Sequence, residues 1–356
     1  YCVAGAWGVG VAGVPTWPLP STILTTPEAL MGFFLYSKNG QLVLAVLAFV
    51  ALMGVLLLIA RLVDRAKGRG NTPVMVAVFG GPALLLLAVG LIYPALRTFW
   101  MSVMDKRSEN FVGIQNYAYL WENPAGLVAL RNTLLWVLLV PLLSTGIGLV
   151  YAVLIDKSRL EKVAKSLLFL PMAISFVGAG IIWKFVYEYR GAAQDQIGLL
   201  NAMITGLGFE PVRFLQDAPM NTIFLILVLV WIQAGFSMVV LSAAIKAVPE
   251  DIIEAARLDG VNGWQMFWRI TVPSIRPSLV VVLTTISIAT LKIFDITRTM
   301  TGAEFNTQVL ANEMYDWSFT FGDNGVGSAM AVVIFLLVIP LVAYNVRQMA
   351  KNRAVR

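Results

Sequence analysis

The residues whose types and spacing are most informative form one run, EAARLDGVNGWQMFWRITVP, between Glu254 and Pro273. The chemistry that this run predicts is non-covalent. The small side chains of Ala255 and Ala256 let a partner surface approach the backbone closely, and Gly260 offers a place for a sharp turn. The run therefore predicts a short protruding helix that docks on another protein.

Residues before and within this run predict where a short helix begins and ends. Pro249 can start a helix because the first helical residue needs no N–H, and Glu250 and Asp251 favour the positive end of the helix dipole. Gly260 can end the helix in a left-handed conformation. The helix should thus be short, with about nine to eleven residues. Its apolar contacts would come from Ile252, Ile253 and Leu258.

Aromatic residues follow the predicted turn at helical spacing. Trp264, Phe267 and Trp268 stand at positions i, i+3 and i+4, which places them on one face of a second helix suited to the lipid headgroup zone. An ordinary amphipathic loop of a membrane protein is the simpler interpretation of the same residues.

Polar side chains also occur inside the apolar stretches on both sides of the run. Such side chains are costly in lipid, so they usually face the interior of a bundle or a watery cavity. The stretch before the run has Gln233, Phe236 and Ser237, and the stretch after it has Thr284, Thr285, Ser287, Thr290, Lys292 and Asp295. Lys292 and Asp295 are three residues apart and could pair on one helix face. A structural ion pair and direct contact with a substrate both stay open for them.

Composition limits the class of protein. Of the 356 residues, 58% are hydrophobic and 13% are charged, and the mean hydropathy is +0.79, values typical of an integral membrane protein. Histidine is absent, no Gly-Lys pair is present to form a P-loop, and the single Cys2 has no thiol partner. We therefore expect no catalytic residue, no metal site and no nucleotide site in this chain.

Seven apolar stretches are long enough, at about 20 residues each, to cross a membrane as helices. They are Gln41–Ala60, Val74–Ala95, Asn132–Ile155, Ser166–Val186, Asn221–Ala247, Ser278–Met300 and Gly327–Asn345. The apolar Tyr1–Pro20 is an open candidate for an eighth span. If Ala60 faces the cytoplasm, most of the 26 basic residues fall in inner segments and in the C-terminal tail, as the positive-inside rule requires. The run from Glu254 to Pro273 would then be cytoplasmic.

This run resembles the signature loop of the membrane-spanning subunits of ATP-driven, binding-protein-dependent (ABC) importers, although the family usually has Leu where Val272 stands. The resemblance implies an all-α integral membrane protein with the type I ABC importer permease fold, a polytopic bundle of seven or eight transmembrane helices. It implies that a short cytoplasmic helix docks into a groove on a separate ATPase. The residues that would couple the chain to the ATPase are Glu254, Ala255, Ala256, Asp259 and Gly260.

Three further segments resemble the carbohydrate branch of these permeases: LKIFDITRTMTG from Leu291, FVGIQNY from Phe111 and, closest to alpha-glucoside permeases, FNTQVLAN from Phe305. In maltose-type relatives the two helices that flank the signature loop hold the sugar midway across the membrane. Matching by position carries this substrate pathway onto Ile232, Gln233, Phe236, Thr285, Ile288, Ala289 and Lys292. Gln233, Thr285 and Lys292 could hydrogen-bond a hydroxyl group, and Phe236 could stack on a sugar face.

The resemblance also implies a domain organisation and an assembly. It predicts an N-terminal segment over 1–72, a transmembrane helix and extracytoplasmic loop over 73–128, a permease core over 129–347 with a coupling loop at 248–276, and a basic cytoplasmic tail over 348–356. The expected partners are a second permease in a heterodimer, two ATPase subunits that hold ATP and Mg, an extracytoplasmic substrate-binding protein, a sugar and the lipid bilayer of the bacterial inner membrane. No nucleic acid is expected.

Other functions remain open at this point. Within the same class, the solute could be a polyol, a glycerol phosphate or an amino acid. An intramembrane enzyme that uses paired carboxylates is the alternative from another class, and a channel or scaffold is a third. Only Asp295 lies clearly inside a predicted span, with Glu188 at a span end, so the sequence shows no carboxylate pair for catalysis.

Overall fold

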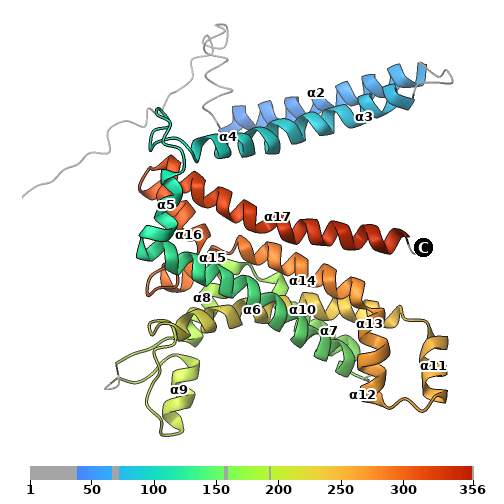
Figure 1. Ribbon diagram of the computed structural model, residues 1–356, viewed down its shortest axis with the longest axis vertical. Helices are drawn as coiled ribbons and strands as arrows, with labels where there is room; N and C mark the ends of the chain where they lie inside the picture. Colours follow the sequence, from blue (N-terminus) through green and yellow to red (C-terminus); the bar gives the residue numbers. More distant parts are fainter. Residues whose placement is uncertain (1–37, 66–71, 156–158, 192–193, 355–356) are drawn as a thin grey trace, which may run out of the picture. The chain divides into compact units, whose positions relative to one another are not determined.

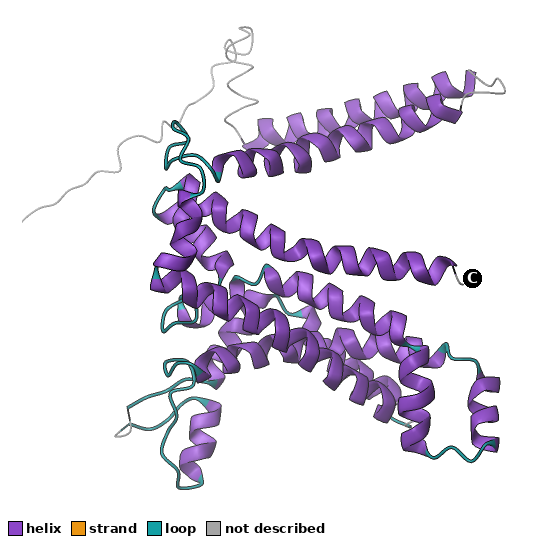
Figure 2. Ribbon diagram, in the orientation of Figure 1, coloured by secondary structure: helices purple, strands orange, loops and turns teal. Residues whose placement is uncertain are grey.

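A computed structural model describes residues 38–65, 72–155, 159–191 and 194–354. The candidate span Tyr1–Pro20 lies outside these residues. The described part is helical, and Figure 2 shows helices and loops but no strand in it. The chain divides into two compact units, 1–92 and 93–356, and this boundary falls inside the segment 73–128.

The described part of the first unit, residues 38–65 and 72–92, consists of two helices and a short π-helical stretch. α2 (Lys38–Arg65) and α3 (Thr72–Leu87) lie side by side in opposite directions (Figure 1). A π-helix, η2 (Ala88–Ile92), follows α3 directly. Pro82 lies inside α3, where its missing N–H removes one hydrogen bond from the helix.

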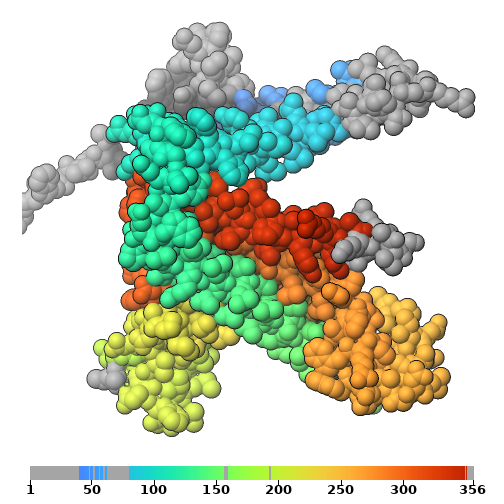
Figure 3. Space-filling view, in the orientation of Figure 1, coloured from blue at the N-terminus to red at the C-terminus, as the bar shows by residue number. Residues whose placement is uncertain are grey.

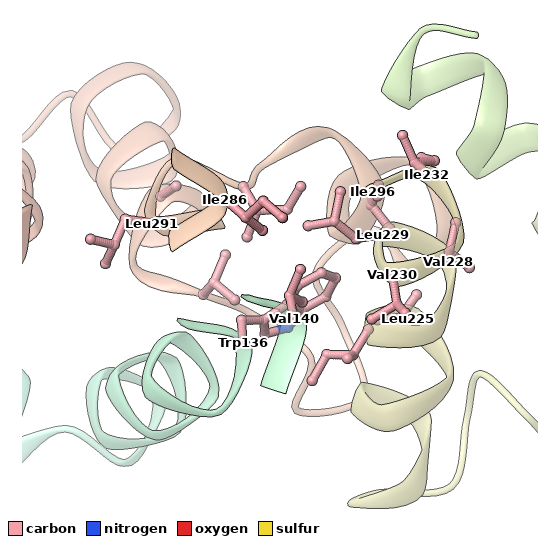
Figure 4. Packing of buried hydrophobic residues seen from close by; sticks show 14 of the residues in the cluster. Trp136, Val140, Leu225, Val228, Leu229, Val230, Ile232, Ile286, Leu291 and Ile296 are labelled. Carbon is pink, nitrogen blue, oxygen red and sulfur yellow. The ribbon is translucent and has the colours of Figure 1, made fainter. Parts of the chain in front are cut away.

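The second unit has a core of four long helices. α6 (Pro124–Ile155) packs against α10 (Met220–Lys246) and α14 (Arg276–Leu291), and α14 also packs against α17 (Asn324–Ala354). Trp136, Val140, Leu225, Leu229 and Ile286 are among the buried residues between them, as Figure 4 shows.

Close approach of backbones holds α6 and α10 together. A Cβ atom on Gly148 of α6 would lie 2.4 Å from the Ser237 Cβ and 2.7 Å from the Met238 nitrogen of α10. Lipid tails are as apolar as the side chains that they surround, so helices in a membrane associate mainly through such tight packing at small residues. Gly148 is therefore a point at which this pair of helices touches.

Four helices in the described residues are long and apolar enough to cross a membrane, or six if two bent pairs each count as one span. The four are Gly80–Met101, Pro124–Ile155, Met220–Lys246 and Asn324–Gln348. The predicted number of seven is not confirmed. The predicted span Gln41–Ala60 is helical within α2 but is not among these six.

The predicted span Ser166–Val186 is not one straight helix. α7 (Glu161–Phe169) and α8 (Phe176–Val186) form a bent pair at an angle of 101°, joined by a 3-10 turn. Pro171 lies in this turn and cannot donate a backbone hydrogen bond. Ser175 then caps α8 by accepting a hydrogen bond from the Gly178 nitrogen at 3.0 Å. A proline followed by a cap thus ends one helix and begins another.

The predicted span Ser278–Met300 is also interrupted. α14 ends at Leu291, and a separate helix, α15 (Asp295–Thr301), begins four residues later. The hydroxyl groups of Thr284, Ser287 and Thr290 donate to carbonyl oxygens of their own helix. Such bonds weaken a helix slightly and favour a bend. The polar side chains that were predicted to face a cavity are therefore partly satisfied within α14 itself.

Short elements connect the long helices at the end opposite the predicted coupling segment. They are α4 (Tyr93–Met101), α5 (Gln115–Glu122), α9 (Leu199–Gly206), α15, α16 (Leu310–Tyr315) and the π-helix η5 (Asp316–Thr320). In Figure 3 the coupling segment, in orange, and the segment that holds α9, in yellow-green, form lobes at opposite ends of the second unit.

Candidate functional site

The helix predicted for the coupling segment is present. α11 (Glu250–Leu258) has nine residues and carries Glu250 and Asp251 in its first turn, so acidic side chains lie at the positive end of its dipole. Pro249 is the residue just before the helix and not its first residue. Gly260 has φ of +78°, the left-handed conformation that was predicted to end the helix.

The second helix of the segment is only partly as predicted. Asn262 and Gln265 form a capping box that starts the short α12 (Gly263–Gln265), and the chain then continues as a π-helix, η4 (Met266–Thr271). The rings of Trp264 and Trp268 still meet, with centroids 5.7 Å apart. A π-helix has a wider turn than an α-helix, so the aromatic group is preserved although the regular α-helical face is not.

Most predicted coupling residues, on α11 and in the turn after it, are exposed, but one is not. Glu254, Ala255, Asp259 and Gly260 are exposed, whereas Ala256 is only 6% exposed. Ala256 therefore packs against its own chain. That Ala256 lets a partner approach the backbone closely stays a prediction, and of the two alanines only Ala255 is exposed. Leu258, at 89% exposed, is the most accessible apolar side chain of the helix.

A hollow separates α11 from the base of the bundle. It has a volume of about 790 Å³. Its walls come from the end of α10, from the inner face of α11 and from η4, and include Lys246, Ile253, Arg257 and Phe267. α11 is thus held away from the bundle by the segments at its two ends, as Figure 1 shows, and its outer face is free of contacts within the described chain.

A cluster of charged residues links α7 of the bent pair to the end of α10, where the coupling segment begins. Glu161 Oε1 of α7 lies 2.7 Å from Lys165 Nζ and 2.5 Å from Lys246 Nζ of α10. Lys165 Nζ also donates to Ser242 Oγ of α10 at 2.5 Å. The cluster is exposed to solvent, so each ion pair by itself stabilises the fold little, but together they fix α7 beside α10. Sequence reasoning did not identify this cluster, although the i, i+4 spacing of Glu161 and Lys165 is a signal for such a pair.

The predicted substrate-pathway residues fall into two groups. Thr285 of α14 and Lys292, the residue just after this helix, are exposed, and Ile288 and Ala289 of α14 are half-buried. Their spacing places them along one face of the helix and its end. The chain's own helices leave this face largely uncovered. On α10, Gln233 and Phe236 are half-buried, whereas Ile232 is only 2% exposed. Ile232 belongs to the hydrophobic core, so the structure does not bring all seven residues to one surface.

The predicted pairing of Lys292 with Asp295 loses its structural basis. Lys292 is the residue that caps the end of α14, and Asp295 is the first residue of α15. Among the residues that the structure describes, no ion pair joins their side chains. The pair was predicted from a single continuous helix, and the chain bends between the two residues.

Comparison with known proteins identifies related sequences. Residues 144–354 match the family model described as the binding-protein-dependent transport system inner membrane component. The osmoprotective compounds uptake permease protein GgtC of Synechocystis sp. is 51% identical over 77% of this chain and 99% of its own length. The alpha-glucoside transport system permease protein AglF of Rhizobium meliloti is 48% identical over 77% of this chain and 82% of its own length.

A solved structure shares the fold. The crystal structure of a bacterial alginate ABC transporter in complex with alginate pentasaccharide-bound periplasmic protein contains a chain that superposes with a TM-score of 0.66 at 22% identity. The match covers 76% of this chain and 92% of that chain. At this identity the likeness concerns the arrangement of the helices.

Proposed function

We propose, from the premise that this chain belongs to the family of binding-protein-dependent transport system inner membrane components, that it is the permease subunit of an ATP-driven sugar importer. One observation carries the proposal: α11 projects from the bundle with an exposed face and is joined directly to α10 by three residues. The names of the relatives favour an alpha-glucoside or a similar osmoprotective compound as the solute.

The structure suggests how force would travel through this chain. A partner ATPase that closes on ATP would push on Glu254, Ala255 and Leu258 of α11. The push would reach α10 through the connection at Pro249, and α7 through the cluster around Glu161. Because α7 packs against α10 and α10 packs tightly against α6, the three helices would move as one body and open the pathway to one side of the membrane or the other. Hydrolysis itself would take place in the partner.

The complete transporter would need several other chains. We infer a second permease, because the face of α14 with Thr285, Ile288, Ala289 and Lys292 is uncovered by this chain and would line a pathway only when a partner closes it. Two ATPase subunits and an extracytoplasmic sugar-binding protein complete the assembly, which would lie in the bacterial inner membrane with the coupling segment and the C-terminus in the cytoplasm. A phosphate-bearing solute would require more cations on this face than Lys292.

Uptake by proteoliposomes that contain the complete transporter tests the function. We expect ATP-dependent accumulation of a radiolabelled alpha-glucoside disaccharide when the binding protein is present. Glu254→Lys should reduce uptake about tenfold or more while the complex stays assembled, since a reversed charge at a docking contact costs about 1.5–3 kcal/mol. Glu122→Lys, which reverses an equally exposed charge on α5, is the matched control and should transport normally.

Two outcomes of this assay would contradict the proposal. Normal uptake by Glu254→Lys would show that α11 does not transmit force from the ATPase. Chemical turnover of the sugar by this chain alone, without ATP, would show that it is an enzyme and not a transport subunit.

A further inference from the structure

A polar cavity lies at the end of the bundle opposite α11. It has a volume of about 440 Å³ and is formed where the end of α8, the segment 213–216 and the region after α15 meet. This location follows from α10, whose first residue, Met220, lies near the cavity and whose last residue leads to the coupling segment. The side chains that line the cavity include Lys184, Glu188, Tyr189, Arg213, Glu304 and Phe305.

The turn that forms one wall has an unusual backbone. Ala303, Phe305 and Asn306 have φ values of 64°, 55° and 59°, and Gly302 before them has 70°. Residues other than glycine adopt this left-handed conformation at a cost of about 1–3 kcal/mol each. Such strained residues persist only where the surrounding structure holds them, and they are concentrated at functional sites and ligand clamps.

Two buried asparagines hold this turn from the core helices. Asn132 Nδ2 of α6 donates to the carbonyl oxygens of Asn306 at 2.7 Å and Gln308 at 3.0 Å. Asn221 Nδ2 of α10 donates to the carbonyl oxygen of Phe305 at 2.8 Å. Both asparagines are 0% exposed. The long helices therefore fix the turn, and with it the positions of Glu304 and Phe305 at the wall of the cavity.

The charged groups of the cavity differ in whether they already have partners. The Arg298 guanidinium pairs with Asp316 at 3.1 Å, and the Arg213 guanidinium lies 5.2 Å from the centre of the Tyr189 ring. Within the described chain, the side chains of Lys184, Glu188 and Glu304 make no hydrogen bond or ion pair with a protein group. The Lys184 ammonium group can therefore donate to a ligand in this cavity, and the carboxylates of Glu188 and Glu304 can accept from it.

This combination fits a neutral ligand that is rich in hydroxyl groups. An ammonium group donates and a carboxylate accepts, so together they can satisfy both roles of a hydroxyl group. The rings of Tyr189 and Phe305 supply the flat apolar surface that ligand pockets usually combine with a few polar groups. Lys184, Arg213 and Arg298 line the cavity together with Glu188 and Glu304, and Asp316 pairs with Arg298. The charges around the cavity therefore balance, which favours a neutral ligand over an anion.

We propose that this cavity is an outer binding site for one glycosyl unit of a neutral oligosaccharide, separate from the predicted pathway residues on α10 and α14. The inference rests on the proposed function, because it assumes that a sugar is the solute. The site would hold the sugar at the outer end of the bundle before the sugar passes between the permeases. Its ligand contacts would come from Lys184, Glu188 and Glu304.

Protection of an introduced cysteine from labelling tests this site in the complete transporter in lipid nanodiscs. Cys2→Ser removes the native thiol, and Gln216→Cys then places one at the cavity wall. We expect trehalose to slow labelling of this cysteine by a membrane-impermeant maleimide, about tenfold when trehalose stands at about ten times its Kd. Glu210→Cys, an exposed position three residues before the segment 213–216 and outside the cavity, should be labelled at an unchanged rate.

A second substitution shows whether the cavity itself binds the sugar. Adding Glu304→Gln or Lys184→Met to Gln216→Cys should raise the Kd for trehalose about tenfold, because each removes one charged hydrogen-bonding group. Labelling that trehalose does not slow, or protection that both substitutions leave unchanged, would overturn the proposal. Protection by the binding protein but not by trehalose would also overturn it, and would assign the cavity to protein docking.

The proposed function is judged by a separate measurement. Energised uptake by the wild-type transporter tests the function, whereas labelling needs no ATP and no transport. If uptake occurs and trehalose gives no protection, the outer site is refuted and the function stands. If the wild type does not take up any sugar under the conditions in which trehalose protects Gln216→Cys, the site stands as a binding site and the import function fails.

Discussion

The pKa of the Glu313 carboxyl group, on α16, depends on its burial and on its hydrogen bond. Tyr119 Oη of α5 donates to Glu313 Oε2 at 2.7 Å and links these two helices. Burial raises the pKa of Glu313 above its ordinary value of 4.5, and the hydrogen bond from Tyr119 opposes this rise. Folding therefore favours the protonated form. The resulting stability is fully present below a pH of 4.5 and is lost as the pH rises through the folded-state pKa.

Glu313→Gln tests this pH dependence. The substitution keeps an oxygen that can accept from Tyr119 but carries no charge at any pH. We expect a higher melting temperature than that of the wild type near neutral pH and no difference below a pH of 4.5. Glu122→Gln on the exposed side of α5 is the control and should leave the melting temperature unchanged at both pH values. An equal shift at both pH values would mean that packing, and not charge, causes the effect.

Single residues show what local sequence can and cannot predict. The left-handed Gly260 and the acidic first turn of α11 were predicted, because both depend on residues within one turn of the helix. The burial of Ala256 was not predicted, since the triplet alone does not show which alanine faces the chain's own core. Asn132 was predicted only as the start of a span. Its bonds reach the carbonyl of Asn306, 174 residues away, and no local pattern reveals such a contact.

At the scale of elements, the contact between α6 and α10 gives a sharp test. Gly148→Ala would place a methyl group 2.4 Å from the Ser237 Cβ, so the two helices would have to move apart. We expect a loss of about 1–3 kcal/mol in stability, as for other overpacked sites, measured as a lower melting temperature in detergent. Gly146→Ala lies on the same helix with no atom within 4 Å and is the control. Equal melting temperatures for both variants would contradict the tight contact.

Elements were predicted well where apolar residues run without interruption and less well where breaks occur. α10 agrees with the predicted span to within one residue at each end, because Met220–Lys246 contains no proline and no strong cap. The bend before α8 had a visible signal in Pro171 and Ser175, and hydropathy averaged over the span hid it. The end of α14 at Leu291 had no such signal, since the hydroxyl groups that weaken this helix also occur in straight membrane helices.

At the scale of the whole chain, composition and one motif were enough to predict the class of protein. The high hydropathy implies a membrane protein, and the signature run implies a permease of the binding-protein-dependent family, to which the chain belongs. The predicted number of seven spans is not confirmed in the described residues, where bends divide some of the apolar stretches. The outer cavity could not be predicted at all, since its walls come from segments that are distant in sequence and meet only after the bundle folds.

The central claim is that α11 docks on a separate ATPase. Crosslinking from single cysteines in a Cys2→Ser background, with the complete transporter and a short bifunctional maleimide, tests it most directly. We expect Ala255→Cys, which is exposed, to crosslink to a cysteine in the ATPase groove, and Ala256→Cys, which is only 6% exposed in the wild type, to crosslink far less. No crosslink from Ala255→Cys in any nucleotide state, or labelling of that cysteine only from the outer side of the membrane, would contradict the account.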